Sequence, residues 1–318
     1  MFVLRKKKLS VKVKGLGNKL GNVLLPITYE VRVIDGDWSV YFSSYEPQRY
    51  GPWDTDCCWC LSTVNSVEDQ LEWLWKNGMF SPEAKAFFTA NGYLDTNGNI
   101  SLSERFIEIL SNNRNTGGSS EEAWQLMKAY GIIPRSMLEY TLERALAQPS
   151  QGAFASDYFA PSAVTQPMRD LGKKFLSYVS IAYQRIGTDW APRNRTIMAA
   201  AVKQAPLCYG IPIPADVFKW NDTVVQYDGS TTVAHEVLGY NIPADGTYPI
   251  YDQYEPHLKT LSADYDIPYC TQGIVTMAAP VAINPTAQPK GEENDAFWTW
   301  VMAWWNGFRN PTIQIGSL

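Results

Sequence analysis

The sequence predicts an α+β fold in which a helical lobe precedes a β lobe. Helical periodicity dominates from about residue 45 to 146, whereas short β-rich runs dominate after Pro206. Helices and strands that are segregated along the chain are typical of the α+β class. The 318 residues, 45% of them hydrophobic and 19% charged, are enough to bury the core of one large domain or of two lobes.

Charge and cysteine usage exclude several classes of protein. A net charge of −5 argues against nucleic acid as the main partner, because phosphate binding needs a basic surface. The basic cluster at residues 5–8 lies in a segment, residues 1–22, that we interpret as a loosely held N-terminal arm. Five cysteines, three of them within residues 57–60, argue against a disulfide scaffold.

No targeting or transmembrane segment is predicted. The charges at residues 5–8 follow the first apolar residues and no long apolar run comes after them, which is not the pattern of a secretory signal. No window reaches the roughly 18 to 20 apolar residues that a transmembrane helix needs. We therefore expect a soluble protein that is made in a cytoplasm.

The strongest helix signal begins at a cysteine. After a β-rich run at 24–33, apolar residues recur at three- and four-residue steps from Cys58 onward, at Leu61, Val64, Val67, Leu71, Leu74 and Trp75. The capping candidates just upstream are Asp54, Thr55 and Asp56. A thiol in the first turn meets the positive end of the helix dipole, which favours the thiolate and so makes a nucleophile.

Two further features follow in the first half of the chain. Residues 81–92 predict a helix with Ser81 as its cap and Pro82 at the first helical position. Residues 95–104 begin like a calcium loop, but Ile100 stands where a glycine is required and Glu104 comes two residues early. We favour a plain turn into a helix capped by Ser101 or Ser103, with calcium binding as the alternative.

The second half changes from helices to strands. Residues 121–130 predict a helix that Gly131 ends, and the Ser-, Gly-, Pro- and Ala-rich residues 147–161 suggest the crossing between the lobes. Helical periodicity returns at 168–186 and at 196–204. The predicted strands lie at 207–213, 232–240, 248–251 and 273–277.

The C-terminal segment, residues 286–318, combines a linker with a Trp-rich helix at 296–308. This helix is too short to span a bilayer. We interpret it as docking on the protein's own surface or on a neighbouring subunit, with binding at a membrane interface as the alternative. The N-terminal arm and this helix are the two candidate contacts for an assembly partner.

A cysteine nucleophile needs a base, and the chain contains only two histidines. His235 lies in a β-rich run that ends at a glycine, where a side chain can point from a rigid strand into a cleft. Asp252 follows on the predicted neighbouring strand, at a separation that suits a hairpin, and can orient the imidazole. Cys58, His235 and Asp252 are therefore a candidate catalytic triad.

Each of these residues also has a structural interpretation. A cysteine at a helix start is more often a small buried hydrophobe, and Asp252 alone would be a solvated hairpin carboxylate. Cys57, Cys58 and Cys60 with two histidines suggest zinc, but neighbouring helical residues point in different directions, so no metal is expected. We interpret Cys57 and Cys60 as packing residues, and His257 as a surface or satisfied histidine.

Several short motifs resemble, in order along the chain, those of the papain family of cysteine peptidases. Cys58-Trp59-x-x-Ser62 is similar to the family's Cys-Trp-Ala-Phe-Ser, and His235-x-Val237-x-Gly239-Tyr240 resembles its His-Ala-Val-x-x-Val-Gly-Tyr. The other matches are Asp37-Trp38, Gln48, Leu102-Ser-Glu104, Asn115-Thr-Gly-Gly118, Ala123-Trp124, Tyr130-Gly131, and Asp252-Gln-Tyr254 in place of Asn-Ser-Trp. Each match is weak alone, whereas the ordered set is strong.

The resemblance implies a papain-like two-lobe fold with the active site in the cleft between the lobes. The helical N-terminal lobe would span about 45–146. The β-barrel-like or antiparallel C-terminal lobe would span about 162–280 and include the strand at 24–33. The peptidase core would thus cover residues 23–285, and no cofactor is implied.

The resemblance also assigns roles to single residues. Cys58 would be the nucleophile and His235 the general base and then acid, oriented by Asp252. The oxyanion hole would combine the Cys58 amide with the side chain of Gln48. An extended peptide or protein substrate would bind along Gly117, Gly118 and Trp59, where a larger side chain at the glycines would obstruct its backbone.

The chain departs from the family pattern at several positions. Gln48 stands ten residues before Cys58, a longer gap than the family has, and Ala234 replaces the usual Asn or Asp before the histidine. Asp252 replaces the usual Asn, and a carboxylate there raises the pKa of His235 and favours a thiolate–imidazolium pair. Residues 76–99 resemble an insertion, and no recognisable propeptide precedes residue 25.

Three functional hypotheses follow. The first is peptide-bond hydrolysis through an acyl-enzyme on Cys58. The second is a structural component of a larger assembly such as a virion, because the basic arm and the Trp-rich helix resemble papain-like proteins encoded by bacteriophages; such a component can also carry an active site. The third is other amide chemistry, such as deamidation or transglutamination, because the same triad serves any acyl transfer.

Overall fold

The computed structural model describes residues 30–43, 45–112, 117–186, 195–214, 220–230 and 235–278. All of them belong to one compact unit that ends at Ala278. The predicted N-terminal arm, most of the strand at 24–33 and the whole segment 286–318 lie outside the described residues. Residues 30–33, the described end of that strand, are not in a strand.

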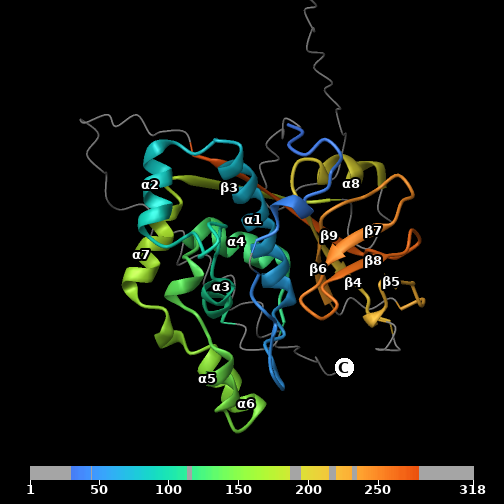
Figure 1. Cartoon of the computed structure of the whole chain (residues 1–318). Coiled ribbons are helices and arrows are strands. Elements are labelled where there is room, and N and C mark those ends of the chain that lie inside the picture. The colour runs from blue at the N-terminus through green and yellow to red at the C-terminus, as the bar shows by residue number, and fades with distance from the viewer. Residues whose placement is uncertain are drawn as a thin grey trace, which may run out of the picture. The chain divides into compact units, whose positions relative to one another are not determined.

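The predicted α+β class is confirmed, with the helices preceding most of the strands along the chain. The helices before the large sheet are α1 (Cys58–Lys76), α2 (Pro82–Ala90), α3 (Glu104–Ser111), α4 (Ser120–Tyr130), α5 (Leu142–Leu146), α6 (Gln151–Tyr158) and α7 (Gln166–Phe175). Figure 1 shows α2, α3 and α7 on one side of the central helix α1 and the strands β6, β7 and β8 on the other.

The described residues contain one large sheet with the strand order β3-β9-β4-β6-β7-β8-β5. Its strands are β3 (Val179–Arg185), β4 (Leu207–Ile211), β5 (Val224–Val225), β6 (His235–Gly239), β7 (Tyr248–Tyr251), β8 (Leu258–Leu261) and β9 (Tyr269–Met277). Neighbouring strands are antiparallel except β5 and β8, which are parallel. Helix α8 (Arg195–Val202) connects to β4, and a separate hairpin joins β1 (Arg49–Tyr50) to β2 (Trp53–Asp54).

Two hydrophobic clusters correspond to the two lobes, and α1 lies where they meet. One cluster gathers the buried faces of the N-terminal helices, and the other gathers apolar residues of the sheet and α8. Trp73 of α1 packs against both clusters. Fully buried side chains such as Val64 and Leu71 each contribute about 1.5–3 kcal/mol. Helix α1 is therefore packed between the two clusters along its length.

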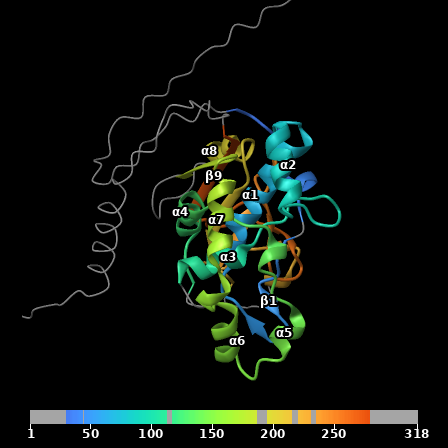
Figure 2. The ribbon, with the colours of Figure 1, turned by 90° about the vertical axis from the view of Figure 1, so that its left-hand side faces the viewer.

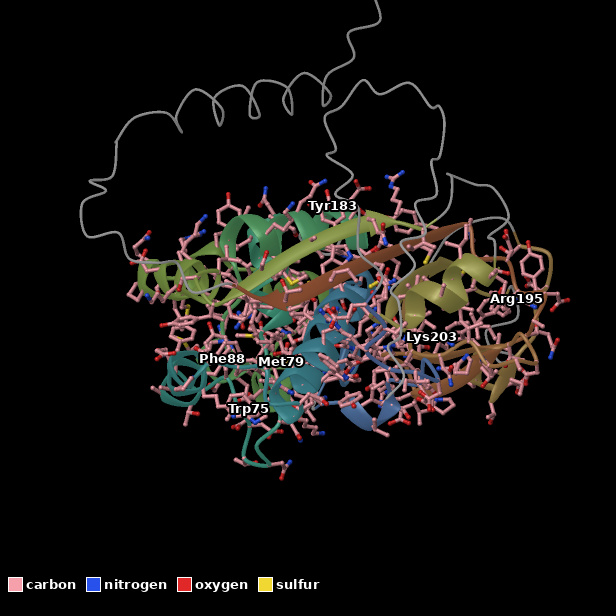
Figure 3. All side chains as sticks on the ribbon, turned by 90° about the horizontal axis from the view of Figure 1, so that it is seen from above. Trp75, Met79, Phe88, Tyr183, Arg195 and Lys203 are labelled. Carbon is pink, nitrogen blue, oxygen red and sulfur yellow. The ribbon has the colours of Figure 1, made fainter. Side chains whose placement is uncertain are left out.

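The two ends of the unit can be followed in the other views. Figure 2, seen from the helical side, shows α7 in front of α1. Figure 3, seen from above, shows Trp75 of α1 and Met79, which follows α1, on the same side as Phe88 of α2. Arg195 and Lys203 mark the region of α8 on the opposite side. Trp75, Phe80 and Phe88 form a run of edge-to-face rings that ties α2 to the end of α1.

Several local predictions are confirmed. Ser81 caps α2 by accepting a hydrogen bond from the amide of Ala84, and Ser103 caps α3 through the amide of Phe106. Residues 95–99 form a turn in which Asp95 Oδ1 accepts from two following amides. Gly131 follows α4, and strand β7 has the predicted bounds.

One predicted helix is shorter than expected, and a helix forms where the sequence predicted none. The helix predicted for 168–186 ends at Phe175, because Val179 and Ile181 alternate with outward-facing residues and pair with β9 as strand β3. Residues 147–161, which the sequence suggested as the crossing between the lobes, contain helix α6, in which the rings of Phe154 and Tyr158 lie one turn apart and are both buried. Burial of two aromatic rings outweighs the lower helix propensity of the Ser and Gly residues there.

The predicted cap of α1 was also wrong. Cys57 is the N-cap residue, and it makes no side-chain capping bond. Asp54 Oδ1 accepts instead from the Asp56 amide and from the side-chain amide of Gln48. None of the described helices combines the length and the apolarity that a bilayer crossing requires.

Candidate active site

Cys58 is the first residue of α1 and the most accessible of the five thiols. Its side chain is partly exposed, whereas Cys57 and Cys60 are 2% and 0% exposed. Burial raises the pKa of both neighbouring thiols well above the ordinary value, as expected of packing residues. The amide of Glu236 donates a hydrogen bond to Cys58 Sγ at 3.4 Å, so the thiol lies against the start of β6.

His235 begins β6 and is bonded to Asp252 at the end of β7. The two strands are antiparallel neighbours, and His235 Nε2 lies 2.7 Å from Asp252 Oδ1. Both side chains are almost completely buried, at 2% and 0% exposure. Because Nε2 is engaged by the carboxylate, Nδ1 is the ring nitrogen left for Cys58. The structure thus brings together all three residues of the predicted triad.

The surroundings of His235 favour its charged form. Burial lowers the pKa of His235, but the charges of Cys58 and Asp252 and the hydrogen bonds to both outweigh burial and raise it to about 10. Burial likewise raises the pKa of Asp252, whereas His235 and then Lys259 hold it below its usual value. A charged imidazolium beside the thiol stabilises a thiolate.

Two aromatic side chains flank the imidazole. The ring of Tyr254 stacks on His235 at 5.2 Å between centroids, and Trp220 meets it edge to face at 5.5 Å. The two rings fix the imidazole plane and shield its bond to Asp252 from water. Tyr254 belongs to a motif that the sequence matched, whereas no spacing in the sequence indicated Trp220.

Lys259 of β8 is a second neighbour of the triad that the sequence did not indicate. Its ammonium group lies 2.7 Å from Asp252 Oδ2, and its side chain has no exposure. The only sequence signal was a lysine inside the apolar-flanked run of residues 258–261. Buried lysines are rare unless they are paired, so this signal appears only once the strand is known to be buried.

Gln48 lies beside the site, but its amide is already occupied. Its Nε2 donates to Asp54 Oδ1 at 2.9 Å and to the Tyr254 hydroxyl at 2.6 Å. The Tyr254 hydroxyl donates in turn to Asp54 Oδ2 at 2.7 Å. An oxyanion bound here would have to replace one of these acceptors, whereas the Cys58 amide lies in the first turn of α1, where amides lack partners within the helix.

Gly117 and Gly118 lie just before α4, where the described chain resumes. Gly117 has a φ of +73°, and a Cβ built there would meet no atom of the described residues within 4 Å apart from its chain neighbours, so that side of the residue is open in the described part of the chain. Ser120 of α4 fixes the segment to β6, because its amide and hydroxyl donate to the carboxylate of Glu236 at 2.9 and 3.1 Å. Burial raises the pKa of Glu236 to about 8.

The prediction that Trp59 contacts a substrate was wrong. Its side chain is 1% exposed and packs in the helical hydrophobic cluster. The physical reason is helical geometry, since consecutive residues of a helix point about 100° apart. When Cys58 faces the sheet, its neighbour faces the helical core.

A surface pocket of about 730 Å³ lies beside the triad. It is lined by Pro47, Arg49, Ile213, Trp220, Asn221, Gln253, Tyr254, Glu255 and His257.

His257 is a half-exposed residue with partners, as predicted: its Nδ1 lies 2.9 Å from the Asp252 carbonyl and its Nε2 lies 3.3 Å from Glu255. Among the described residues, no group of His, Cys, Asp and Glu side chains could hold a metal ion.

Comparison with known proteins gives low similarity. No protein-family model matches the chain, and no curated protein is significantly similar to it in sequence. Among solved structures, the chain is similar to the bromelain protease from Ananas comosus in complex with the E64 inhibitor, at 14% identity over 76% of this chain and 98% of that one, with a TM-score of 0.48.

Two proforms are similar to about the same degree. Digestive procathepsin L 3 from the larval midgut of Tenebrio molitor is 18% identical over 75% of this chain and 68% of that one. The ragweed pollen allergen Amb a 11, a cysteine protease, is 14% identical over 81% of this chain and 62% of that one, less than two thirds of its length. Both TM-scores are 0.47, and values below 0.5 establish neither a family nor an activity for this chain.

Proposed function

We propose that this protein is a papain-like cysteine peptidase that hydrolyses peptide bonds through an acyl-enzyme on Cys58. The observation that carries the proposal is the buried imidazole of His235, which bonds a carboxylate through Nε2 and lies next to a partly exposed thiol at a helix start. The order of the sequence motifs supports the same assignment. This arrangement is that of an activated thiol nucleophile.

In the proposed reaction, the Cys58 thiolate attacks the carbonyl carbon of the scissile bond and its electrons move onto the oxygen. The amide of Cys58, and Gln48 after release of one of its present acceptors, would donate to that oxyanion. The imidazolium of His235 then protonates the leaving amine, and a thioester remains on Cys58. Neutral His235 next takes a proton from a water whose oxygen attacks the thioester, which releases the carboxylic acid and restores the Cys58 thiolate beside the imidazolium.

Alkylation kinetics test the proposed thiol–imidazole pair. Iodoacetamide at pH 7 should modify Cys58 in the native protein, and His235→Ala should slow that modification by at least about 10-fold, because the neutralising imidazolium is lost. Peptide mapping identifies the modified cysteine. His257→Ala is the matched control and should label at the rate of the native protein. Equal rates of labelling of Cys58 in the native protein and in His235→Ala would contradict the proposal.

The other two functional hypotheses remain predictions. Deamidation or transglutamination would use the same Cys58, His235 and Asp252, so the geometry of the triad does not favour either over hydrolysis. A role in a larger assembly such as a bacteriophage virion depends on the basic arm at 1–22 and the helix at 296–308, which lie outside the described residues. No specific feature of the described part of the chain favours these hypotheses over hydrolysis.

A further inference from the structure

The ammonium group of Lys259 has a complete set of partners deep in the site. It donates to Asp252 Oδ2 at 2.7 Å, to the carbonyl of Tyr254 at 2.7 Å and to the carbonyl of Pro256 at 2.6 Å. These three acceptors match the three N–H bonds of a charged lysine. A buried ammonium group is costly unless it is paired and fully hydrogen-bonded, and this one is both.

The carboxylate of Asp252 is shared between two cations. Its Oδ1 accepts from His235 Nε2 at 2.7 Å and from the Tyr254 amide at 3.2 Å, while its Oδ2 accepts only from Lys259 among the bonds of the described residues. The carboxylate plane is therefore fixed at both oxygens. The positive charge of Lys259 also reduces the electrostatic effect of the Asp252 carboxylate on the imidazole.

We propose that Lys259 is a positioning residue of the active site, whose charge partly offsets that of Asp252, so that the pair presents His235 with a fixed acceptor of reduced negative charge. The inference rests on the proposed thiol–imidazole chemistry of the same site. It identifies Asp252 and Lys259 as one functional unit, in which replacing either residue alone leaves an uncompensated charge beside the imidazole.

The charged and titratable groups around His235 come from each element packed against it. They are Cys58 of α1, Glu236 of β6, Asp252 and Tyr254 after β7, and Lys259 of β8. In the thiolate–imidazolium form of the proposed mechanism, the charges of Cys58, His235, Asp252 and Lys259 sum to zero while Glu236 is protonated. Asparagine at position 252 would instead leave two cations close together, and their repulsion would disfavour the imidazolium.

A purely structural role for Lys259 makes a different prediction. Its ammonium group also lies 5.2 Å from the Trp220 ring, so it could act only by packing and by bonding the two carbonyls. In that case, a second substitution at Lys259 would not raise the pKa of His235 that Asp252→Asn had lowered. If Lys259 acts through its charge, a second substitution that removes this charge raises the pKa of His235 part of the way back.

The experiment follows the imidazole of His235 directly by NMR. The chain has only two histidines, so the imidazole signal that remains in the spectrum of His257→Gln belongs to His235. The variants are Asp252→Asn, Lys259→Gln, Asp252→Asn with Lys259→Gln, and Asp252→Asn with Lys259→Arg. Glutamine can still donate to the two carbonyls but carries no charge, whereas arginine keeps the charge. Lys259→Met replaces Lys259→Gln if the glutamine variant does not fold.

We expect His235 to remain an imidazolium up to about pH 9 in the native protein and in Lys259→Gln, since nearby opposite charges raise its pKa. Asp252→Asn should lower the midpoint by at least about two pH units. Adding Lys259→Gln should raise that midpoint again by about one pH unit or more. Adding Lys259→Arg should leave it low.

Two results would overturn the proposal. One is a double variant with glutamine that titrates at or below the midpoint of Asp252→Asn. The other is identical midpoints for the glutamine and arginine double variants. The titration needs no peptidase activity, so it remains informative even if the protein hydrolyses no peptide. Failure of the proposed function would appear instead as unreactive Cys58 in the alkylation experiment.

Discussion

Replacing Cys58 by alanine lowers kcat/KM for peptide hydrolysis by at least about 10⁴-fold in the proposed mechanism, because no other group can form the acyl-enzyme. Cys58 is the partly exposed thiol at the start of α1, next to the histidine strand. Hydrolysis of a fluorogenic peptide library by native and variant protein measures the effect. Circular dichroism checks that the variant is folded.

Cys60→Ala is the matched control for that measurement. Cys60 lies two residues further along the same helix, but its thiol is fully buried and donates to the Glu104 carbonyl. Its removal should lower stability by about 1 kcal/mol and leave hydrolysis nearly unchanged. Retention of activity in Cys58→Ala, or equal loss in both variants, would contradict the assignment of the nucleophile.

The second large effect is the position of the alkaline limb of activity. Protonation of the leaving amine needs the imidazolium of His235, which exists below its pKa of about 10. Activity should therefore persist well above the ordinary histidine pKa of about 6.5 and fall only as the pH approaches 10. The measurement is kcat/KM between pH 5 and 10.5. A limb near pH 7 would show that Cys58 and Asp252 do not hold the proton on His235.

Folding stability must be followed over the same range, because it is linked to the same group. The pKa of His235 is raised in the folded state above its unfolded value, so this histidine stabilises the fold fully below about pH 6.5. That stabilisation decreases as the pH rises and is lost through about pH 10. Asp252 acts in the opposite direction, since its depressed pKa gives stabilisation that is lost as the solution becomes acidic.

The triad could be predicted because its members are rare and lie in a fixed order. Only two histidines were available, and the β-rich run ending at Gly239 placed one of them on a rigid strand. Helical periodicity from Cys58 onward defined α1. These signals are local, so they can be recognised without knowledge of tertiary contacts.

The partners of the triad could not be predicted, because they depend on long-range packing. Lys259 reaches Asp252 through the β7–β8 pairing, and Trp220 contacts His235 from a segment that lies outside the strands. Gln48 was placed near the site correctly, but its bonds to Asp54 and Tyr254 depend on the conformation of the β1–β2 hairpin. A sequence motif identifies such a side chain but does not indicate which groups it is hydrogen-bonded to.

The misassigned strand β3 has a related cause. The sequence from Met168 to Ile186 carries apolar residues that fit a helical period, yet the second part of it alternates buried and outward residues. Antiparallel pairing with β9 along its whole length decides in favour of the strand. Tertiary pairing of this kind overrides local propensity.

The most direct test of the proposed mechanism is the detection of the acyl-enzyme itself. The protein is incubated with 4-nitrophenyl acetate, quenched in acid during turnover and analysed by peptide mass spectrometry. The mechanism predicts an acetyl group on the peptide that contains Cys58, removed by hydroxylamine and absent from Cys58→Ala. Ester turnover without any acyl group on Cys58, or with the group on another residue, would contradict it.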